Sequence, residues 1–146
     1  MTEPDESPTV AEPADGTSTV EVRTAASAAL IPTIRAVASD LAARADFDLD
    51  AISDLRMAVD EACATLVDLA APSSTLTCTF RVQAERIEVK AQVEAAQDGI
   101  SVSTDTFGWR VLQTLADHVE AQRSQGNGGA PVVGIRLDKR AGDLSR

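Results

Sequence analysis

The sequence predicts an α+β fold, a two-layer sandwich with helices on one face of a mainly antiparallel sheet. Apolar residues recur every three or four positions in three segments and alternate with polar residues in three others. The chain has 146 residues, enough for one domain with a sizeable core. Because only 3% of the residues are aromatic, Ala, Val and Leu must build that core, which suits helices packed on a sheet. The expected order is β-α-α-β-β-α-β.

Composition divides the chain into a tail and one domain. Residues 1–18 combine acidic residues with Pro, Ser and Thr and hold few large apolar side chains, so we predict a disordered acidic tail. The domain is expected over residues 19–140, and residues 141–146 are expected to be flexible. The net charge is −10, and neither a basic patch nor a basic helix is present. Nucleic acid and anionic membranes are therefore disfavoured as partners, whereas a basic protein partner is compatible.

The features that the sequence lacks indicate where the protein is located in the cell and in which state its two cysteines are. No apolar run approaches the ~18 residues of a membrane span, and the N-terminus has no basic, apolar signal sequence. A cytoplasmic protein is expected. Cys63 and Cys78 are too few for a disulfide framework and lack metal-ligand spacing, so both are predicted to be buried free thiols and no metal site is predicted.

The first strand and the first helix are predicted near the tail. Apolar and polar residues alternate over residues 20–24, which indicates a short strand. Ser27 then precedes a helix over residues 28–45 as its N-cap, and Pro32 falls in the first turn, where its missing N–H does little harm. The apolar stripe of this helix is expected to consist of Leu30, Ile34, Val37 and Leu41.

The second helix organises the chain. Asp48 or Asp50 is expected to cap it, and it ends near Pro72, because proline cannot continue a helix. Its apolar stripe, typical of a helix lying on a sheet, is Ile52, Leu55, Val59, Ala62, Leu66 and Leu69. Glu61 and Thr65 lie one turn apart on the neighbouring stripe. They indicate either a small polar site beside the buried face or a solvated flank with an intrahelical hydrogen bond.

The remaining chain supplies a hairpin, a helix and a strand. Residues 76–82 and 87–93 alternate strictly, and the short link between them predicts an antiparallel hairpin. After a polar loop, a third helix is expected over residues 107–120, with Val111, Leu112, Leu115 and Val119 on its apolar side. The glycine-rich segment 126–129 is predicted to be a flexible connection, since a strand over residues 132–137 follows it rather than a helix.

Two side chains of the third helix have competing interpretations. His118 is predicted to be an exposed helix histidine rather than a catalytic one, because no nucleophile or metal partner accompanies it. Trp109 is interpreted as a core or lid residue rather than a residue that stacks on a nucleotide.

With these elements in order, the sequence resembles a known family. The segment 58–63 (Ala-Val-Asp-Glu-Ala-Cys), followed by the hairpin and by residues 108–119, is similar to anti-sigma factors of the sigma-B/sigma-F type. These belong to the GHKL, or histidine-kinase-like, ATPase superfamily, and the likeness is greatest to actinobacterial (mycobacterial-type) members. The resemblance spans roughly residues 20–138. It implies a homodimer that sequesters an alternative sigma factor and is released by an anti-anti-sigma protein.

The resemblance also implies candidate site residues. Many members use ATP and magnesium to phosphorylate a serine of the anti-anti-sigma protein. Glu61 matches their general base, whereas Thr65 replaces the asparagine that holds magnesium. Asp98 and Gly99 stand near the adenine-binding Asp-x-Gly but lack the intervening residue. Gly108 alone remains of the glycine-rich phosphate loop. These departures together predict an ATP site that is weakened or lost.

Two function classes remain open on the sequence alone. The first is a binding protein, an anti-sigma factor that needs only the fold and a partner surface. The second is an ATP-dependent serine kinase, for which Glu61 is the one intact catalytic feature. A structural module with another partner is a third alternative. The sequence favours the binding protein, although binding and kinase activity can coexist on one fold.

Overall fold

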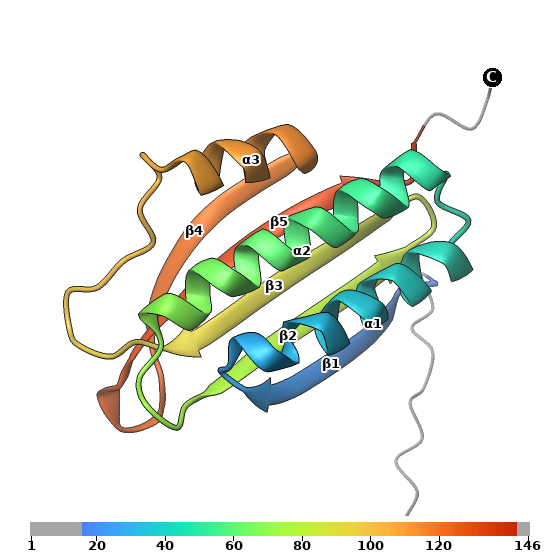
Figure 1. Ribbon diagram of the computed structural model, residues 1–146. Coiled ribbons are helices and arrows are strands. Elements are labelled where there is room, and N and C mark those ends of the chain that lie inside the picture. Colours follow the sequence, from blue (N-terminus) through green and yellow to red (C-terminus); the bar gives the residue numbers. More distant parts are fainter. Residues whose placement is uncertain (1–15, 143–146) are drawn as a thin grey trace, which may run out of the picture.

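The computed structural model describes residues 16–142 and has two layers, an antiparallel sheet and three α-helices on one of its faces (Figure 1). The strands lie in the order β1-β2-β3-β5-β4. This arrangement confirms the predicted α+β sandwich. The predicted tail and the predicted flexible C-terminus fall largely outside the described residues. Both end segments reach into the described range. Ser18, assigned to the tail, belongs to the first strand, and Ala141, assigned to the flexible C-terminus, donates its N–H to the Glu85 carbonyl at 2.9 Å.

The sheet contains five strands, and every neighbouring pair is antiparallel. They are β1 (Ser18–Ala25), β2 (Thr75–Gln83), β3 (Arg86–Glu94), β4 (His118–Gln125) and β5 (Pro131–Arg140). Residues 84 and 85 link β2 to β3, which confirms the predicted hairpin. On β2 the side chains of Leu76, Cys78 and Phe80 are fully buried beneath the helices, whereas their neighbours along the strand point to the open face.

Three α-helices and two short 3-10 turns complete the fold. They are η1 (Ala28–Leu30), α1 (Ile31–Arg44), α2 (Leu49–Leu69), α3 (Phe107–Leu115) and η2 (Asn127–Gly129). Ser27 is an N-cap, as predicted, but it caps η1: its hydroxyl accepts a hydrogen bond from the Ala29 N–H at 3.2 Å. The α-helix itself begins at Ile31, later than predicted, and its N-cap Leu30 makes no side-chain hydrogen bond. None of the helices within residues 16–142 is long and apolar enough to span a membrane.

The long helix α2 follows its prediction closely. Asp48 is the N-cap, and its carboxylate accepts a hydrogen bond from the Ala51 N–H at 2.8 Å. Leu55 and Leu66 of the predicted stripe have no solvent exposure. The prediction for α1 was less accurate, because the buried face is rotated toward small residues. That face consists of Ile31, Ile34, Ala38 and Ala42.

The prediction of a third helix over residues 107–120 was wrong beyond Leu115. Ala116 is extended, with φ −100° and ψ 154°, and the Asp117 N–H donates to the Asp138 carbonyl at 2.9 Å. The chain thereby enters the sheet as β4, a fifth strand that the predicted element order lacks. Pairing with β5, a contact between distant segments, overrides the local helical periodicity. His118 is exposed, as expected, but it lies on this strand rather than on a helix.

The glycine-rich segment is a turn of defined geometry. It joins β4 to β5, and the Gly126 N–H donates to the Ala130 carbonyl at 2.7 Å. Gly128 and Gly129 have φ of +74° and +80°, values that side chains disfavour, which explains the glycines here. The core lies between the sheet and the helices and includes the Trp109 side chain, which is only 6% exposed. This burial confirms Trp109 as a core residue.

Candidate functional site

Glu61 and Thr65 lie in the second half of α2, and both are half-buried. The Thr65 hydroxyl donates to the Glu61 carboxylate at 3.5 Å, the outer limit for a hydrogen bond. The contact is the intrahelical bond that the spacing predicts. It leaves most of the hydrogen-bonding capacity of the carboxylate unused, because no other described residue forms a hydrogen bond or an ion pair with Glu61.

The structure brings the Glu61 carboxylate against the start of α3. Thr106 is the N-cap of this helix and accepts a hydrogen bond from the Trp109 N–H at 3.0 Å. A methyl group built on Gly108 would overlap the Glu61 carboxylate. Glycine at this position therefore allows α2 and α3 to pack with the carboxylate between them. Glu61, Thr65 and Gly108, which are separated by up to 47 positions in sequence, thus form one group.

The other two candidate residues lie apart from this group. Asp98 and Gly99 are exposed in the loop that connects β3 to α3. Asp98 forms no hydrogen bond or ion pair with any residue of the described range 16–142. Gly99 has φ +85° in open space, so it serves the turn of the loop.

The charges at the start of α3 affect which ligands can bind at the group formed by Glu61, Thr65 and Gly108. The N-terminus of a helix attracts anions through its free N–H groups and its dipole. Here the Thr106 side chain already engages one N–H, and the Glu61 carboxylate already supplies a negative charge beside Gly108. A phosphate placed against Gly108 would meet that carboxylate and be repelled by it. Within residues 16–142, no three His, Cys, Asp or Glu side chains are grouped to hold a metal ion.

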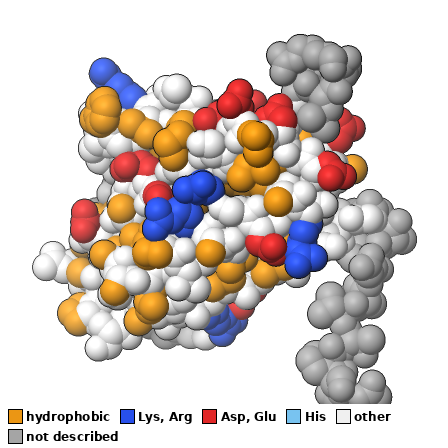
Figure 2. Space-filling model, turned by 45° about the vertical axis from the view of Figure 1, so that its right-hand side comes forward, with side chains coloured by type: hydrophobic (Ala, Val, Ile, Leu, Met, Phe, Trp, Pro, Cys, Tyr) orange, Lys and Arg blue, Asp and Glu red, His pale blue; other side chains and the backbone are white. Residues whose placement is uncertain are grey.

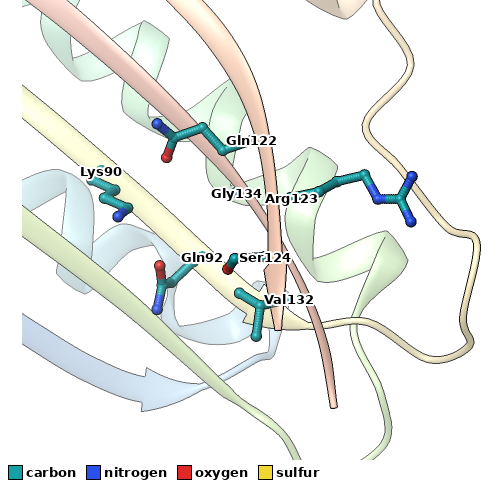
Figure 3. A pocket seen from close by; sticks show the side chains of 7 residues that line it. All are labelled: Lys90, Gln92, Gln122, Arg123, Ser124, Val132 and Gly134. Carbon is teal, nitrogen blue, oxygen red and sulfur yellow. The ribbon is translucent and has the colours of Figure 1, made fainter. Parts of the chain in front are cut away.

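The open face of the sheet carries a feature that the sequence did not predict. Gln92, Gly134 and Gln122 are register partners across β3, β5 and β4. Because Gly134 has no side chain, a cavity of about 320 Å³ remains between the two glutamines (Figure 3). Lys90, Ser124 and Val132 also border it. A Cβ on Gly134 would come within 2.8 Å of the Ala91 carbonyl oxygen, so close strand packing excludes a larger residue.

Ion pairs occupy the neighbouring rows of the same face. Arg136 on β5 binds Glu88 of β3 through two nitrogens and Glu120 of β4 at 3.0 Å, and Arg81 of β2 lies 3.5 Å from Glu88. The hydrogen bond to Glu88 raises the pKa of Arg136, with the charge of Glu88 and the bond to Glu120 acting in the same direction and burial opposing them. These charges link four strands on the side without helices. Only the register of the strands, which the sequence did not predict, reveals this network.

Cys63 and Cys78 are buried free thiols, as predicted. Their side chains also meet: the two sulfur atoms are 3.7 Å apart. The sequence did not indicate this contact between the two residues. Two signals could have indicated it: Cys78 stands at an inward position in the alternation of β2, and Cys63 lies on the sheet-facing side of α2.

The chain has a long helix carrying Glu61, a hairpin and a short helix with Gly108 in its first turn, an arrangement that matches a known class. The histidine kinase-like ATPase domain matches residues 24–133, and the chain belongs to this family. Its relatives include the anti-sigma-F factors RsbW of two Mycobacterium tuberculosis strains, CDC 1551 / Oshkosh and ATCC 25618 / H37Rv. Each is 34% identical over 133 residues, which cover 90% of this chain and 79% of the relative. The resemblance to anti-sigma factors of this superfamily is thereby confirmed.

Proposed function

We propose that this protein is an anti-sigma factor: it sequesters an alternative sigma factor of the sigma-B/sigma-F type and is released by an anti-anti-sigma protein. The observation that carries the proposal is the 34% identity to anti-sigma-F factors, which extends over 90% of the chain. The likeness therefore includes the helical layer as well as the sheet. Sequestration requires a binding surface and no chemical step, so it tolerates changes in a nucleotide site.

The surface of the molecule is compatible with a protein partner. Figure 2 shows hydrophobic side chains in separate patches with charged side chains between them. Phe107 on α3 and Leu49 on α2 are large apolar side chains with more than four-fifths of their area exposed. Such anchors within charged surroundings are typical of protein interfaces. The net charge of −10 favours a partner with a basic surface.

We further propose that ATP and magnesium bind weakly or not at all. Three observations support this view: Thr65 stands at the position of the metal-holding asparagine, Asp98 is exposed and unpaired within the described range, and the Glu61 carboxylate lies at Gly108. A hydroxyl is a poorer ligand for a hard cation than an amide oxygen. Serine kinase activity is the second candidate function, and Glu61, held beside the start of α3, is the feature that favours it.

Calorimetric titration with a sigma factor tests sequestration. The full chain is titrated with a sigma factor of this type after treatment with an enzyme that removes nucleotides. Tight binding is expected without ATP. Binding that disappears after this treatment and returns with ATP and magnesium would instead make the nucleotide essential and contradict the proposed loss of the ATP site.

Phosphotransfer to an anti-anti-sigma protein separates the two candidate functions. We compare the wild type with Glu61→Gln and Thr65→Asn, and with Asp68→Asn, a position on the same helix, as a matched control. Transfer by the wild type is expected to be weak or absent. Thr65→Asn is expected to increase ATP affinity, because the amide oxygen projects from the same helix face as Glu61. Robust wild-type transfer that Glu61→Gln alone abolishes would establish a working kinase.

The family resemblance also leads us to propose a homodimer. Light scattering coupled to size-exclusion chromatography on the full chain measures the mass directly. A monomer mass at micromolar concentration would contradict this part of the proposal and leave sigma binding to be tested separately.

A further inference from the structure

The two cysteines of this chain lie opposite each other in its core. Cys63 belongs to α2 and Cys78 to β2, and neither has any solvent exposure. The separation of their sulfur atoms, 3.7 Å, is a thiol–thiol hydrogen-bond contact. A disulfide bond is about 2.05 Å long, so joining them requires the two sulfurs to approach by roughly 1.7 Å.

Packing directs both thiols to the same place. Cys63 lies on the sheet-facing side of α2, next to Ala62, and Cys78 points inward from β2, where its register partners are Val22 and Ala91. Ala91 beside Cys78 in the register and Ala62 beside Cys63 in sequence are small, whereas Val22 flanks Cys78 on the β1 side. Rotation of the two side chains and a small approach of α2 to the sheet can bring the sulfurs together.

We propose that Cys63 and Cys78 form an oxidation site, at which a hydroperoxide converts the two thiols to a disulfide that joins α2 to β2. In the first step one sulfur attacks the peroxide, the O–O bond breaks, and a sulfenic acid and one water (or alcohol) form. In the second step the other thiol attacks the sulfenic sulfur, the S–S bond forms, and a second water leaves. Two thiols are oxidised, and one peroxide is reduced, so atoms and electrons balance.

Burial determines the kinetics of this reaction. The hydrogen bond with Cys78 and burial raise the pKa of the Cys63 thiol, with smaller contributions from the charges of Cys78 and Asp60. The reactive thiolate is therefore scarce in the closed fold, and oxidation proceeds through transient local opening of α2 from the sheet. Asp60 faces this region and is itself paired with Arg35 of α1 at 3.5 Å. The finished bond is buried again, so its reduction also requires local opening of α2 from the sheet.

The disulfide would act on the group of residues around Glu61. Cys63 is two positions from Glu61 and two from Thr65 on the same helix. Drawing α2 toward β2 therefore moves the carboxylate relative to Gly108, the residue that already has no space for a methyl group. This consequence does not depend on the sigma factor, so the oxidation site can be tested separately from the proposed function.

Mass spectrometry of the oxidised full chain tests the proposal. The protein is incubated with hydrogen peroxide, the remaining thiols are blocked, and the intact and digested protein are analysed without reduction. We expect a monomer that has lost two hydrogen atoms and a peptide pair linked through Cys63 and Cys78. The melting temperature is expected to rise by roughly 5–10 °C, because the cross-link restricts the unfolded chain, and to return to its original value with dithiothreitol.

Single variants and a denatured sample provide the controls. Cys63→Ala and Cys78→Ala should each abolish the mass change and the shift in melting temperature; circular dichroism verifies that the variants are folded. The wild-type peptide map does not depend on the variants. Two intact thiols in the native chain, under conditions that link them in urea, would overturn the proposal. A cross-link between two chains, or sulfinic acid without a disulfide, would overturn it as well.

Discussion

The two faces of the sheet differ sharply although they share the same five strands. On β2, Phe80 has no exposed area, whereas the adjacent Thr79 points to the open face. The covered face carries buried, mainly apolar side chains that form one core with residues of the helices. Figure 1 shows the helices on this face. The open face holds the Arg136 ion pairs and the cavity above Gly134. Alternation along a strand thus assigns stability to one face and surface chemistry to the other.

The charge of Arg136 on the open face is neutralised within the sheet itself. Arg136 has a carboxylate on each neighbouring strand, so the network needs no other partner. The cavity region differs: Lys90, Gln92, Gln122 and Ser124 form no side-chain hydrogen bond or ion pair with any described residue. The open face therefore has one part that is satisfied internally and one part whose side chains are not, including the buried Gln122 Oε1, which has no hydrogen-bond partner among the described residues.

The largest effect is expected from truncating the covered face. Phe80→Ala should lower the free energy of unfolding by about 3–5 kcal/mol, because it removes a fully buried ring and leaves a cavity. Thr79→Ala, one residue away on the open face, should change it by less than about 1 kcal/mol. Urea denaturation of both variants measures the contrast. Equal losses would show that the two faces contribute alike to stability.

A smaller effect is expected at Gly134. Gly134→Ala should lower the free energy of unfolding by about 1–3 kcal/mol, since the new methyl group lies within 2.8 Å of the Ala91 carbonyl oxygen and the strands must separate. Gln122→Ala, in the same row, is the control and should stay within about 0.5 kcal/mol. Urea denaturation again gives both values. If Gly134→Ala leaves the free energy of unfolding unchanged, strand packing does not require glycine at this position, and the cavity is the remaining reason for it.

The ion-pair network should contribute less again. Glu88→Gln keeps the shape of the side chain but removes the charge that Arg136 contacts, with an expected loss of about 1–2 kcal/mol. The loss should shrink at high salt, because part of the interaction is screened. Denaturation at low and high ionic strength tests this expectation. A loss independent of salt would indicate that packing rather than charge is responsible.

The smallest effect is expected for a pair outside the sheet. Asp40 and Arg44 form an exposed i,i+4 ion pair on α1, with a distance of 2.8 Å. Asp40→Asn should change the free energy of unfolding by no more than about 0.5 kcal/mol. The same denaturation assay provides the measurement, and a loss comparable to that of Glu88→Gln would erase the distinction between networked and isolated pairs.

Elements with strong local signals were predictable from the sequence. The stripe containing Leu55 and Leu66, together with the Asp48 cap, defined α2, and strict alternation defined the β2–β3 hairpin. Strand β4 carries almost no such signal. It lies at an edge of the sheet, most of its side chains are exposed, and no glycine or proline separates it from α3. Only its pairing with β5 defines it, and pairing between distant segments is not visible in local periodicity.

The candidate site was predictable in part for the same reason. Helical spacing alone placed Thr65 beside Glu61, and the structure contains that contact. The approach of Gly108 to Glu61 joins two elements separated by the hairpin, so only the family resemblance suggested it. The meeting of Cys63 with Cys78 and the Arg136 network required the packing of α2 on the sheet and the strand register, respectively. Neither follows from spacing along the chain.

The position of β5 has a consequence for how the chain folds as it is synthesised. Among the strands of residues 16–142, β5 comes last in sequence, yet it lies between β3 and β4. β1, β2 and β3 are adjacent and can assemble as soon as they leave the ribosome. β4 emerges before its hydrogen-bonding partner and must wait with its backbone groups in water until residues 131–140 follow. Insertion of the C-terminal strand therefore completes the sheet, and the Arg136 network forms in that final step.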